Sequence, residues 1–172
     1  MKKFFIFAIG LCLSFSVACS SSKKNKKDDK QVKSSSSDSS YLSVAYDTLK
    51  KRPIYGFAYK KSIVAMDVWD AWINENQTLI EKLLPKLPKG YVMQVTGHAD
   101  ASGPEYPVGK KPGNIKISTE RALSVYNLLL SRGLDPAKLT YKGLGSKNLI
   151  PEEKPKAAKQ RRVTFLIVPD KK

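Results

Sequence analysis

The stretch NIKISTERALSVYNLLL, residues 114–130, decides the fold of this chain. Its apolar residues recur at the spacing of an amphipathic helix. The pattern predicts a helix from Ser118 to Arg132, with Ser118 as its N-cap and Gly133 as the residue that ends it. The residues expected to face the core are Ala122, Val125 and Leu129.

Strand and helix patterns alternate on either side of this helix. The expected strands are Ile54–Tyr59, Tyr91–Thr96, Leu139–Gly143 and Arg162–Val168, and a second helix is expected over Asp67–Leu84. Trp69 and Trp72 lie at helical spacing in that helix and are interpreted as core residues. Short turns are expected after Asp135 and near residues 155–160. The order predicts an α/β fold, a β-α-β-α-β-β sandwich with two main helices packed on one face of a mixed sheet.

The N-terminal residues are expected to lie outside the folded domain. Residues 1–18 have a positive start, a short apolar run and small residues at the end, which is the pattern of a secretory signal peptide. Residues 19–40 are rich in Ser and Lys and are predicted to form a disordered tether. The domain is therefore expected over residues 41–172, with its core at residues 54–168.

Cys19 is a candidate lipidation site. The sequence Ser16-Val17-Ala18-Cys19 resembles the lipobox of bacterial lipoproteins, which implies that Cys19 carries the lipid, palmitate included, at the mature N-terminus. Ser16 and Ala18 also fit ordinary signal peptidase, which would release a soluble exported protein. Once the signal peptide is removed, Cys19 is the only cysteine left, so no internal disulfide is possible.

The chain is strongly basic, with a formal net charge of +16. Residues 41–172 alone hold 23 basic and 12 acidic residues, a balance that is also found in nucleic-acid-binding domains. Export argues against nucleic acid as a partner, and no run interleaves arginines with aromatic residues for base stacking. The charge is interpreted as a basic surface that faces an anionic cell envelope.

Asp100 and Arg121 are the candidate binding residues. Asp100 follows a predicted strand, after Gly97, which lets the backbone turn. Arg121 is expected in the first turn of its helix, where the helix dipole disfavours a cation. The two side chains could form a structural salt bridge, or they could bracket a zwitterion, with the ammonium on Asp100 and the carboxylate on Arg121. The residues alone leave both arrangements open.

An enzyme is not expected. His98 is the only histidine, and the chain has no G-x-S-x-G motif for a nucleophile. His98 is therefore interpreted as a packing or loop-orienting residue. No catalytic residue, metal site or cofactor is expected.

Several motifs follow one another in a recognisable order. The pattern N-x-x-L-S-x-x-R-A-x-x-V-x-x-x-L is matched from Asn114 to Leu129, with Ile117 in place of Leu. The shorter matches are Gly97-His98-Ala99-Asp100 to G-H-x-D, Gly143-Leu144-Gly145 to G-x-G, and Gln160-Arg161-Arg162-Val163 to N-R-R-V with Gln for Asn. Together they make residues 54–168 resemble the OmpA-like peptidoglycan-binding domain family, which includes the C-terminal region of OmpA, the peptidoglycan-associated lipoprotein and MotB.

The resemblance implies non-covalent binding of peptidoglycan. In the family the positions of Asp100 and Arg121 hold the zwitterionic end of diaminopimelate in the stem peptide, and the positions of Asn114 and Arg162 line or support the pocket. The implied ligand-binding residues are Asp100, Arg121, Asn114, Arg162, Gly97 and Tyr59. Whether the diamino acid is diaminopimelate or another one stays open.

The chain departs from the family in two places. Where the family has Asp or Asn just after the first strand, this chain has Ala58, Tyr59 or Lys60, and the Tyr59 hydroxyl could replace that contact. The segment Pro107–Gly113, PVGKKPG, lengthens the loop before Asn114. It is either an inert insertion or a source of lysine contacts to carboxylates of the glycan or peptide.

These inferences describe an outer-membrane lipoprotein whose domain faces the periplasm. Its expected partners are the peptidoglycan stem peptide and, through the lipid anchor, the membrane, with other envelope proteins left open. Lipidation does not fix which side of the membrane the domain occupies, so a surface-exposed adhesin is the alternative function. A motor role like that of MotB is not expected, because the N-terminus has the pattern of a cleaved signal rather than of a retained transmembrane helix.

Overall fold

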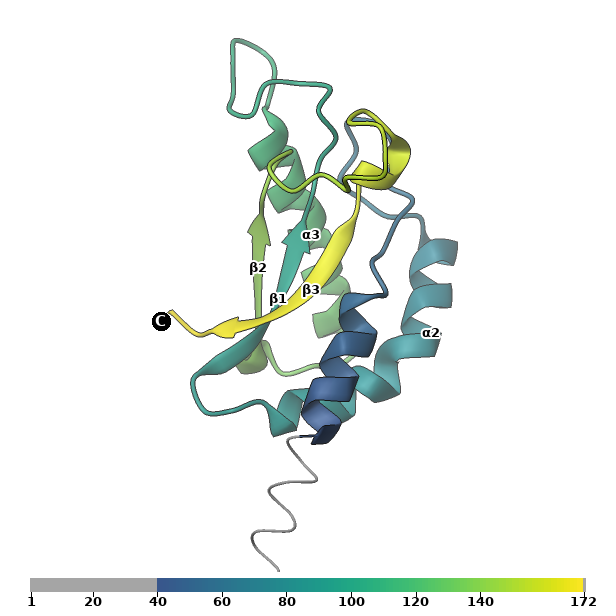
Figure 1. The fold of residues 1–172 in the computed structure, drawn as a ribbon, viewed down its shortest axis with the longest axis vertical. Helices are drawn as coiled ribbons and strands as arrows, with labels where there is room; N and C mark the ends of the chain where they lie inside the picture. The colour runs from purple at the N-terminus through teal and green to yellow at the C-terminus, as the bar shows by residue number, and fades with distance from the viewer. Residues whose placement is uncertain (1–39, 172) are drawn as a thin grey trace, which may run out of the picture.

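The computed structural model describes residues 40–171 (Figure 1). The predictions for the signal peptide, for Cys19 and for most of the tether lie outside the described residues. Ser40, expected as the last residue of the tether, is helical. In the described part of the chain no helix has both the length and the apolar character needed to cross a bilayer.

Three strands form a mixed sheet in the order β2-β1-β3. The central strand β1 (Tyr91–Gly97) pairs in parallel with β2 (Leu139–Gly143) and antiparallel with β3 (Val163–Pro169). The predicted strands at these three places are confirmed. Because β3 runs against β1, with Gly97 opposite Val163, the residues that follow β1 and those that precede β3 lie at the same end of the sheet.

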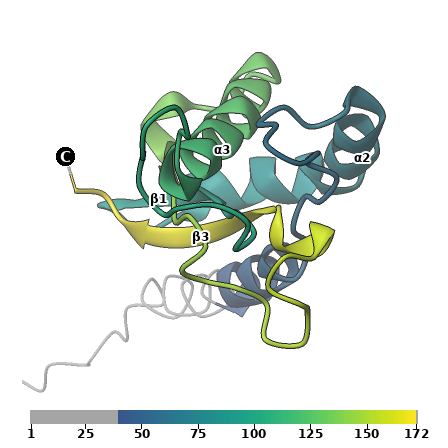
Figure 2. The same ribbon diagram turned by 90° about the horizontal axis from the view of Figure 1, so that it is seen from above.

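Two long helices cover one side of the sheet, as predicted. Helix α2 (Met66–Leu83) and helix α3 (Asn114–Ser131) lie on the same side in Figure 2. Trp72 of α2 stacks on Phe165 of β3, with 4.8 Å between the ring centroids. The α3 residues expected to face the core are all buried: Ala122, Val125 and Leu129. Gly133, with a φ of 83°, follows the end of α3 as predicted.

Short turns lie where the sequence predicted them. The 3₁₀ turn η2 (Pro136–Lys138) is capped by Asp135, whose carboxylate accepts a hydrogen bond of 2.8 Å from the Ala137 N–H. The turn η3 (Ala158–Gln160) leads toward β3. The turn η2 thus lies directly before β2, and η3 lies near the end of the loop that joins β2 to β3.

The predicted first strand, Ile54–Tyr59, is wrong. Only Ile54 pairs with the sheet, through a single bridge to Val163. Gly56 has a φ of 90°, and the chain turns again at Lys60, which has a φ of 57°. These left-handed conformations are incompatible with a continuous strand, so the segment becomes a loop beside the end of β1.

The prediction that Ser118 is an N-cap is also wrong, because α3 begins at Asn114, four residues earlier. The Ser118 hydroxyl instead donates to the Ile115 carbonyl at 2.9 Å and accepts from the Gly145 N–H at 2.8 Å. Arg121 is consequently the eighth residue of α3 and does not lie in its first turn. The argument from the helix dipole therefore does not apply to Arg121.

Residues 40–50 form a helix that was not predicted. Ala45 and Leu49 are buried in the common core, and Lys86 of the turn η1 (Leu84–Lys86) lies over the Tyr41 ring, with its Nζ 5.6 Å from the centroid. Figure 2 shows this helix on the side of β3 opposite to α3. It closes the core at the end of the molecule where β1 begins.

Candidate functional site

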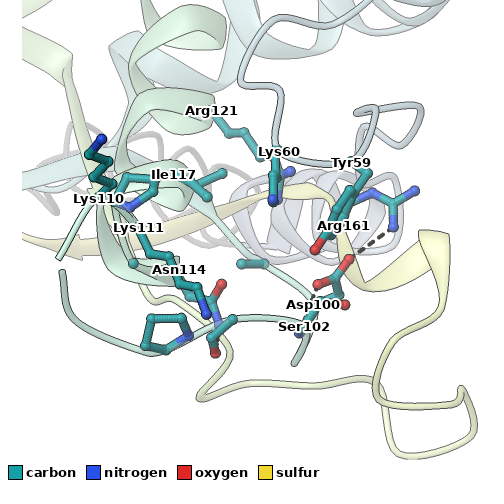
Figure 3. Close-up of a pocket in the computed structure, with 15 residues that line it drawn as sticks. Tyr59, Lys60, Asp100, Ser102, Lys110, Lys111, Asn114, Ile117, Arg121 and Arg161 are labelled. Carbon is teal, nitrogen blue, oxygen red and sulfur yellow. Dashed lines mark hydrogen bonds and ion pairs between the residues drawn. The ribbon is translucent and has the colours of Figure 1, made fainter. Parts of the chain in front are cut away.

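A pocket of about 370 Å³ opens beyond the C-terminal end of β1 (Figure 3). Its walls come from the loop at Tyr59, the chain after β1, the segment before α3, the first turns of α3, and the residue that follows η3. The charged residues that line it are Asp100, Lys60, Lys110, Lys111, Arg121 and Arg161. Of the residues predicted from the sequence, Asp100, Arg121, Asn114 and Tyr59 line the pocket, whereas Gly97 and Arg162 do not.

Asp100 is a buried carboxylate, with 4% of its surface exposed. Its Oδ2 lies 2.9 Å from Nη1 of Arg161, and its Oδ1 accepts a hydrogen bond of 3.0 Å from the Ser102 N–H. Burial alone would raise the pKa of Asp100, but the hydrogen bonds from Arg161 and Ser102 outweigh it and lower that pKa below its ordinary value. Asp100 is therefore ionised at neutral pH and fixed in direction.

Arg121 is the most enclosed charge in the pocket, with 1% of its surface exposed. Its Nε donates to the Lys61 carbonyl at 2.8 Å, its Nη1 to the His98 carbonyl at 2.9 Å, and its Nη2 to the Ala58 carbonyl at 3.4 Å. Among the described residues no ion pair joins Arg121 to Asp100. The structural salt bridge between these two residues, one of the two predicted arrangements, is therefore wrong.

The Arg121 guanidinium keeps its charge despite this enclosure. Burial and repulsion by Arg161 lower the pKa of Arg121 to about 10, while attraction to Asp100 opposes the shift. The guanidinium also lies 5.6 Å from the centroid of the Phe57 ring. A guanidinium has about five N–H donors, so the three bonds to carbonyls leave two for a ligand in the pocket.

Arg161, rather than Arg162, is the second arginine of the site. Its Nε donates to the Phe57 carbonyl at 2.8 Å while its Nη1 binds Asp100. Arg162 is buried away from the pocket and donates to the Asn148 carbonyl at 2.9 Å and the Gln160 carbonyl at 3.4 Å. Neighbouring side chains point to opposite sides of an extended chain. That alternation is the sequence signal that only one arginine of the pair can face Asp100.

Asn114 and Gly97 set the frame of the pocket. The Asn114 amide donates to the Gly103 carbonyl at 3.1 Å, and its backbone N–H donates to the Pro104 carbonyl at 2.8 Å, which ties the start of α3 to the loop after Asp100. A Cβ at Gly97 would overlap the carbonyl oxygen of Ser118. Gly97 therefore acts through the close approach of β1 and α3.

His98 is buried and neutral, with 4% of its surface exposed. Its Nε2 lies 2.9 Å from the Thr164 hydroxyl, and its Nδ1 has no hydrogen-bond partner among the described residues. Burial, assisted by the positive charge of Arg162, lowers the pKa of His98 to about 3. Its backbone carbonyl accepts from Arg121, so this geometry agrees with the interpretation of His98 as a packing and orienting residue.

Tyr59 and Lys60 stand at the rim. Tyr59 is 52% exposed, and the Lys60 Nζ lies 5.2 Å from the centroid of its ring. The positive φ of Lys60 turns the chain so that the carbonyls of Ala58 and Lys61 both reach Arg121. The loop thus supports the guanidinium with its backbone and offers one exposed ring to the pocket.

Comparison with known proteins agrees with this geometry. Residues 73–162, just over half of the chain, match the OmpA family, and the match includes Asp100, Asn114, Arg121 and Arg161. No curated protein sequence matches the chain. Solved structures also resemble its fold, among them the two that follow. The C-terminal domain of Helicobacter pylori MotB is 24% identical, with a TM-score of 0.51 over 69% of this chain and 86% of that one. The peptidoglycan-associated lipoprotein of Burkholderia pseudomallei is 19% identical, with a TM-score of 0.50 over 68% of this chain and 90% of that one.

The family match, the mixed sheet and the order of the motifs together show that this chain belongs to the OmpA family.

Proposed function

We propose that this protein binds peptidoglycan non-covalently, in the pocket beyond β1. Membership of the OmpA family supports a binding protein rather than an enzyme. The observation that carries the proposal is the presence, in one pocket, of a buried carboxylate and a buried guanidinium that are not paired with each other, Asp100 and Arg121. A ligand with an ammonium and a carboxylate on one carbon fits that arrangement.

The ligand proposed is the diamino acid of the stem peptide, diaminopimelate. Its side-chain end carries both an ammonium and a carboxylate. A carboxylate group offers about four lone-pair sites, so Asp100 can accept from the ammonium while it holds Arg161 and Ser102. The two remaining N–H groups of Arg121 would donate hydrogen bonds to the ligand carboxylate. Asn114 and Tyr59 complete the wall, and no bond is made or broken.

The surroundings of the two charges prepare them for this ligand. Asp100 is oriented by two hydrogen bonds and Arg121 by three. Little side-chain entropy is therefore lost when the ligand binds. Because both groups are buried, their interactions with the ligand would also be screened less by water and salt than those of surface charges.

The test is sedimentation with purified peptidoglycan sacculi, using the full chain in a mild detergent. Asp100→Asn keeps the shape of the side chain and removes its charge. Leaving a buried ligand ammonium without its partner costs about 2–5 kcal/mol, so the apparent affinity should fall by a factor of at least ten. Asp70→Asn is the matched control, because Asp70 is exposed on α2 and pairs with Arg132. Binding by Asp100→Asn equal to that of the control would contradict the proposal.

A second comparison tests the diamino acid. Sacculi that contain diaminopimelate should bind the protein, and free diaminopimelate should compete with them. Sacculi that carry lysine at the same position lack the second carboxylate and should bind weakly. Equal binding to both kinds of sacculi would mean that the zwitterionic end is not what the pocket recognises.

We further propose that the protein is an outer-membrane lipoprotein, with Cys19 as the anchor and the domain facing the periplasm. The support is the sequence of residues 1–40, with its signal-peptide pattern, its cysteine and its polar tether. In this arrangement the pocket links the membrane to the cell wall. Labelled palmitate should be incorporated into the wild type and not into Cys19→Ser. Labelling of both proteins, or of neither, would remove Cys19 as the anchor.

A further inference from the structure

The segment Pro107–Gly113, left unexplained by the resemblance to the family, forms a small hairpin beside the pocket. The backbone N–H of Val108 donates to the Lys111 carbonyl at 3.1 Å, and the N–H of Lys111 donates back at 3.0 Å. Gly109, with a φ of 55°, and Lys110 form the tip. Lys110 and Lys111 both line the pocket.

The base of this hairpin is fixed to the body of the domain. Gly113 has a φ of 80°, and a Cβ there would come within 2.5 Å of the Tyr106 backbone, so the two ends of the segment touch. The Ile115 N–H donates to the Glu105 carbonyl at 3.0 Å. The Glu105 carboxylate in turn accepts from the Ser146 N–H at 3.1 Å and from its hydroxyl at 2.7 Å. The lysines are therefore carried on an anchored loop.

The charges that line the pocket are not balanced. It has five cationic side chains and one carboxylate, Asp100, which is already bound to Arg161. Among the described residues neither Lys110 nor Lys111 has an ion-pair partner. A zwitterionic ligand end has no net charge, so it would leave this positive potential uncompensated.

The cations are spread across the pocket, with Arg121 and Lys60 between Lys110 and Arg161 in Figure 3. Figure 3 shows Lys110 and Lys111 toward one side of the pocket and Asp100 with Arg161 toward the other, with Asn114 between them. A ligand that filled the pocket would thus place its zwitterionic end at Asp100 and a different part of the molecule beside the lysines. The part that suits two unpaired ammonium groups is an anion.

We propose that Lys110 and Lys111 form a second anion subsite, which binds another carboxylate of the same stem peptide. This inference rests on the proposed function and adds to it a requirement for two carboxylates in the ligand. A stem peptide has two further carboxylates that could serve, on the glutamate-derived residue before the diamino acid and at the C-terminus of the peptide. Amidation of the one that is used abolishes its charge and weakens binding.

The experiment measures the dissociation constants of three synthetic stem peptides by calorimetry at low ionic strength. One peptide has both additional carboxylates free, and each of the others has one of them amidated. The full chain is compared with the double variant Lys110→Gln/Lys111→Gln and with the control Lys82→Gln/Lys89→Gln. Lys82 and Lys89 are exposed and lie before β1, at the end of the sheet away from the pocket. The two double variants therefore have the same net charge.

One amidation should weaken binding to the wild type and to the control by roughly three- to tenfold, as expected for two partly exposed ion pairs. The Lys110→Gln/Lys111→Gln variant should bind the free peptide more weakly by a similar factor and lose its sensitivity to that amidation. Which amidation has the effect identifies the carboxylate. Equal denaturation midpoints for the variants will show that the loop change has not unfolded the domain.

Two outcomes separate the inference from the proposed function. If the wild type binds the free peptide and Asp100→Asn does not, but amidation weakens the wild type and the Lys110→Gln/Lys111→Gln variant equally or not at all, the second subsite is wrong and the proposed function stands. If the wild type binds none of the peptides and no sacculi, the proposed function fails, and the subsite fails with it.

Discussion

Arg121→Lys is expected to destabilise the whole domain as well as weaken ligand binding. Arg121 joins α3 to two other segments, because its guanidinium donates to the carbonyls of Lys61, His98 and Ala58. A lysine keeps the positive charge but has one ammonium in place of a fork that reaches three acceptors. It can satisfy one of these carbonyls well and leaves the others without their donor.

The magnitude follows from the two shorter bonds, of 2.8 and 2.9 Å. A hydrogen bond from a charged donor contributes about 1.5–3 kcal/mol, and a buried carbonyl left without a donor costs a similar amount. If lysine keeps one short bond and loses the other together with the weaker contact, the free energy of unfolding should fall by about 2–4 kcal/mol. That loss is smaller than the total stability of most domains, about 5–15 kcal/mol, so the variant should still fold.

Urea unfolding followed by tryptophan fluorescence measures this change, since Trp69 and Trp72 both lie in the core. Arg132→Lys is the matched control. Arg132 pairs with Asp70 through side chains that are 37% and 52% exposed, and such surface pairs contribute about 0–1 kcal/mol. If Arg121→Lys lowers the free energy of unfolding no more than Arg132→Lys does, the three carbonyl contacts do not hold the domain together and the reasoning is refuted.

Two further predictions concern the end of β1. His98 is the only histidine, and its pKa is about 3 when folded against an ordinary 6.5, so its contribution to stability is complete above about pH 6.5 and is lost as the pH falls toward 3. Urea titrations should show about 2 kcal/mol less stability at pH 5 than at pH 7, and His98→Gln should flatten that slope; an equal slope in both proteins would exclude His98 as its source. Gly97→Ala should lower the free energy of unfolding by about 1–3 kcal/mol or more, because its Cβ would overlap the Ser118 carbonyl. In thermal unfolding Gly103→Ala, whose Cβ meets only the end of a side chain, should stay near the wild type, and an unchanged Tm for Gly97→Ala would contradict the close packing.

The sequence predicted the sheet and the two long helices well, because their periodicity is continuous and their ends are marked. Gly133 and Pro136 mark the end of the segment after α3, Tyr91–Thr96 alternates at the strand period, and Val163–Val168 is almost entirely apolar. The helix over residues 40–50 was not predicted, although Leu42, Ala45 and Leu49 have helical spacing. Its apolar face is narrow and it follows directly on the polar Ser- and Lys-rich stretch, so its stability comes from tertiary packing rather than from a strong local signal.

The site was predicted in part, for physical reasons that differ from residue to residue. Asp100 and Arg121 share a pocket, as the motif pattern indicated. The partner of Asp100 could not be deduced from the two adjacent arginines in Gln160-Arg161-Arg162-Val163, because the choice depends on which of them faces Asp100. Ser118 was predicted as a cap because it precedes the apolar run of the helix. Its hydroxyl instead accepts a hydrogen bond from the Gly145 N–H, in a loop that is distant in the sequence.

The helix over residues 40–50 has a mechanical consequence. Figure 1 shows its start at one end of the molecule, and the pocket opens at the other, beyond the end of β1. A pull between Ser40 and a ligand at Asp100 would act along the length of the domain and would peel this helix from its first turn. Each residue that passes from helix to extended chain adds about 1.8 Å. Residues 40–50 thus hold an extension of about 20 Å, and releasing it would expose Ala45 and Leu49 of the common core.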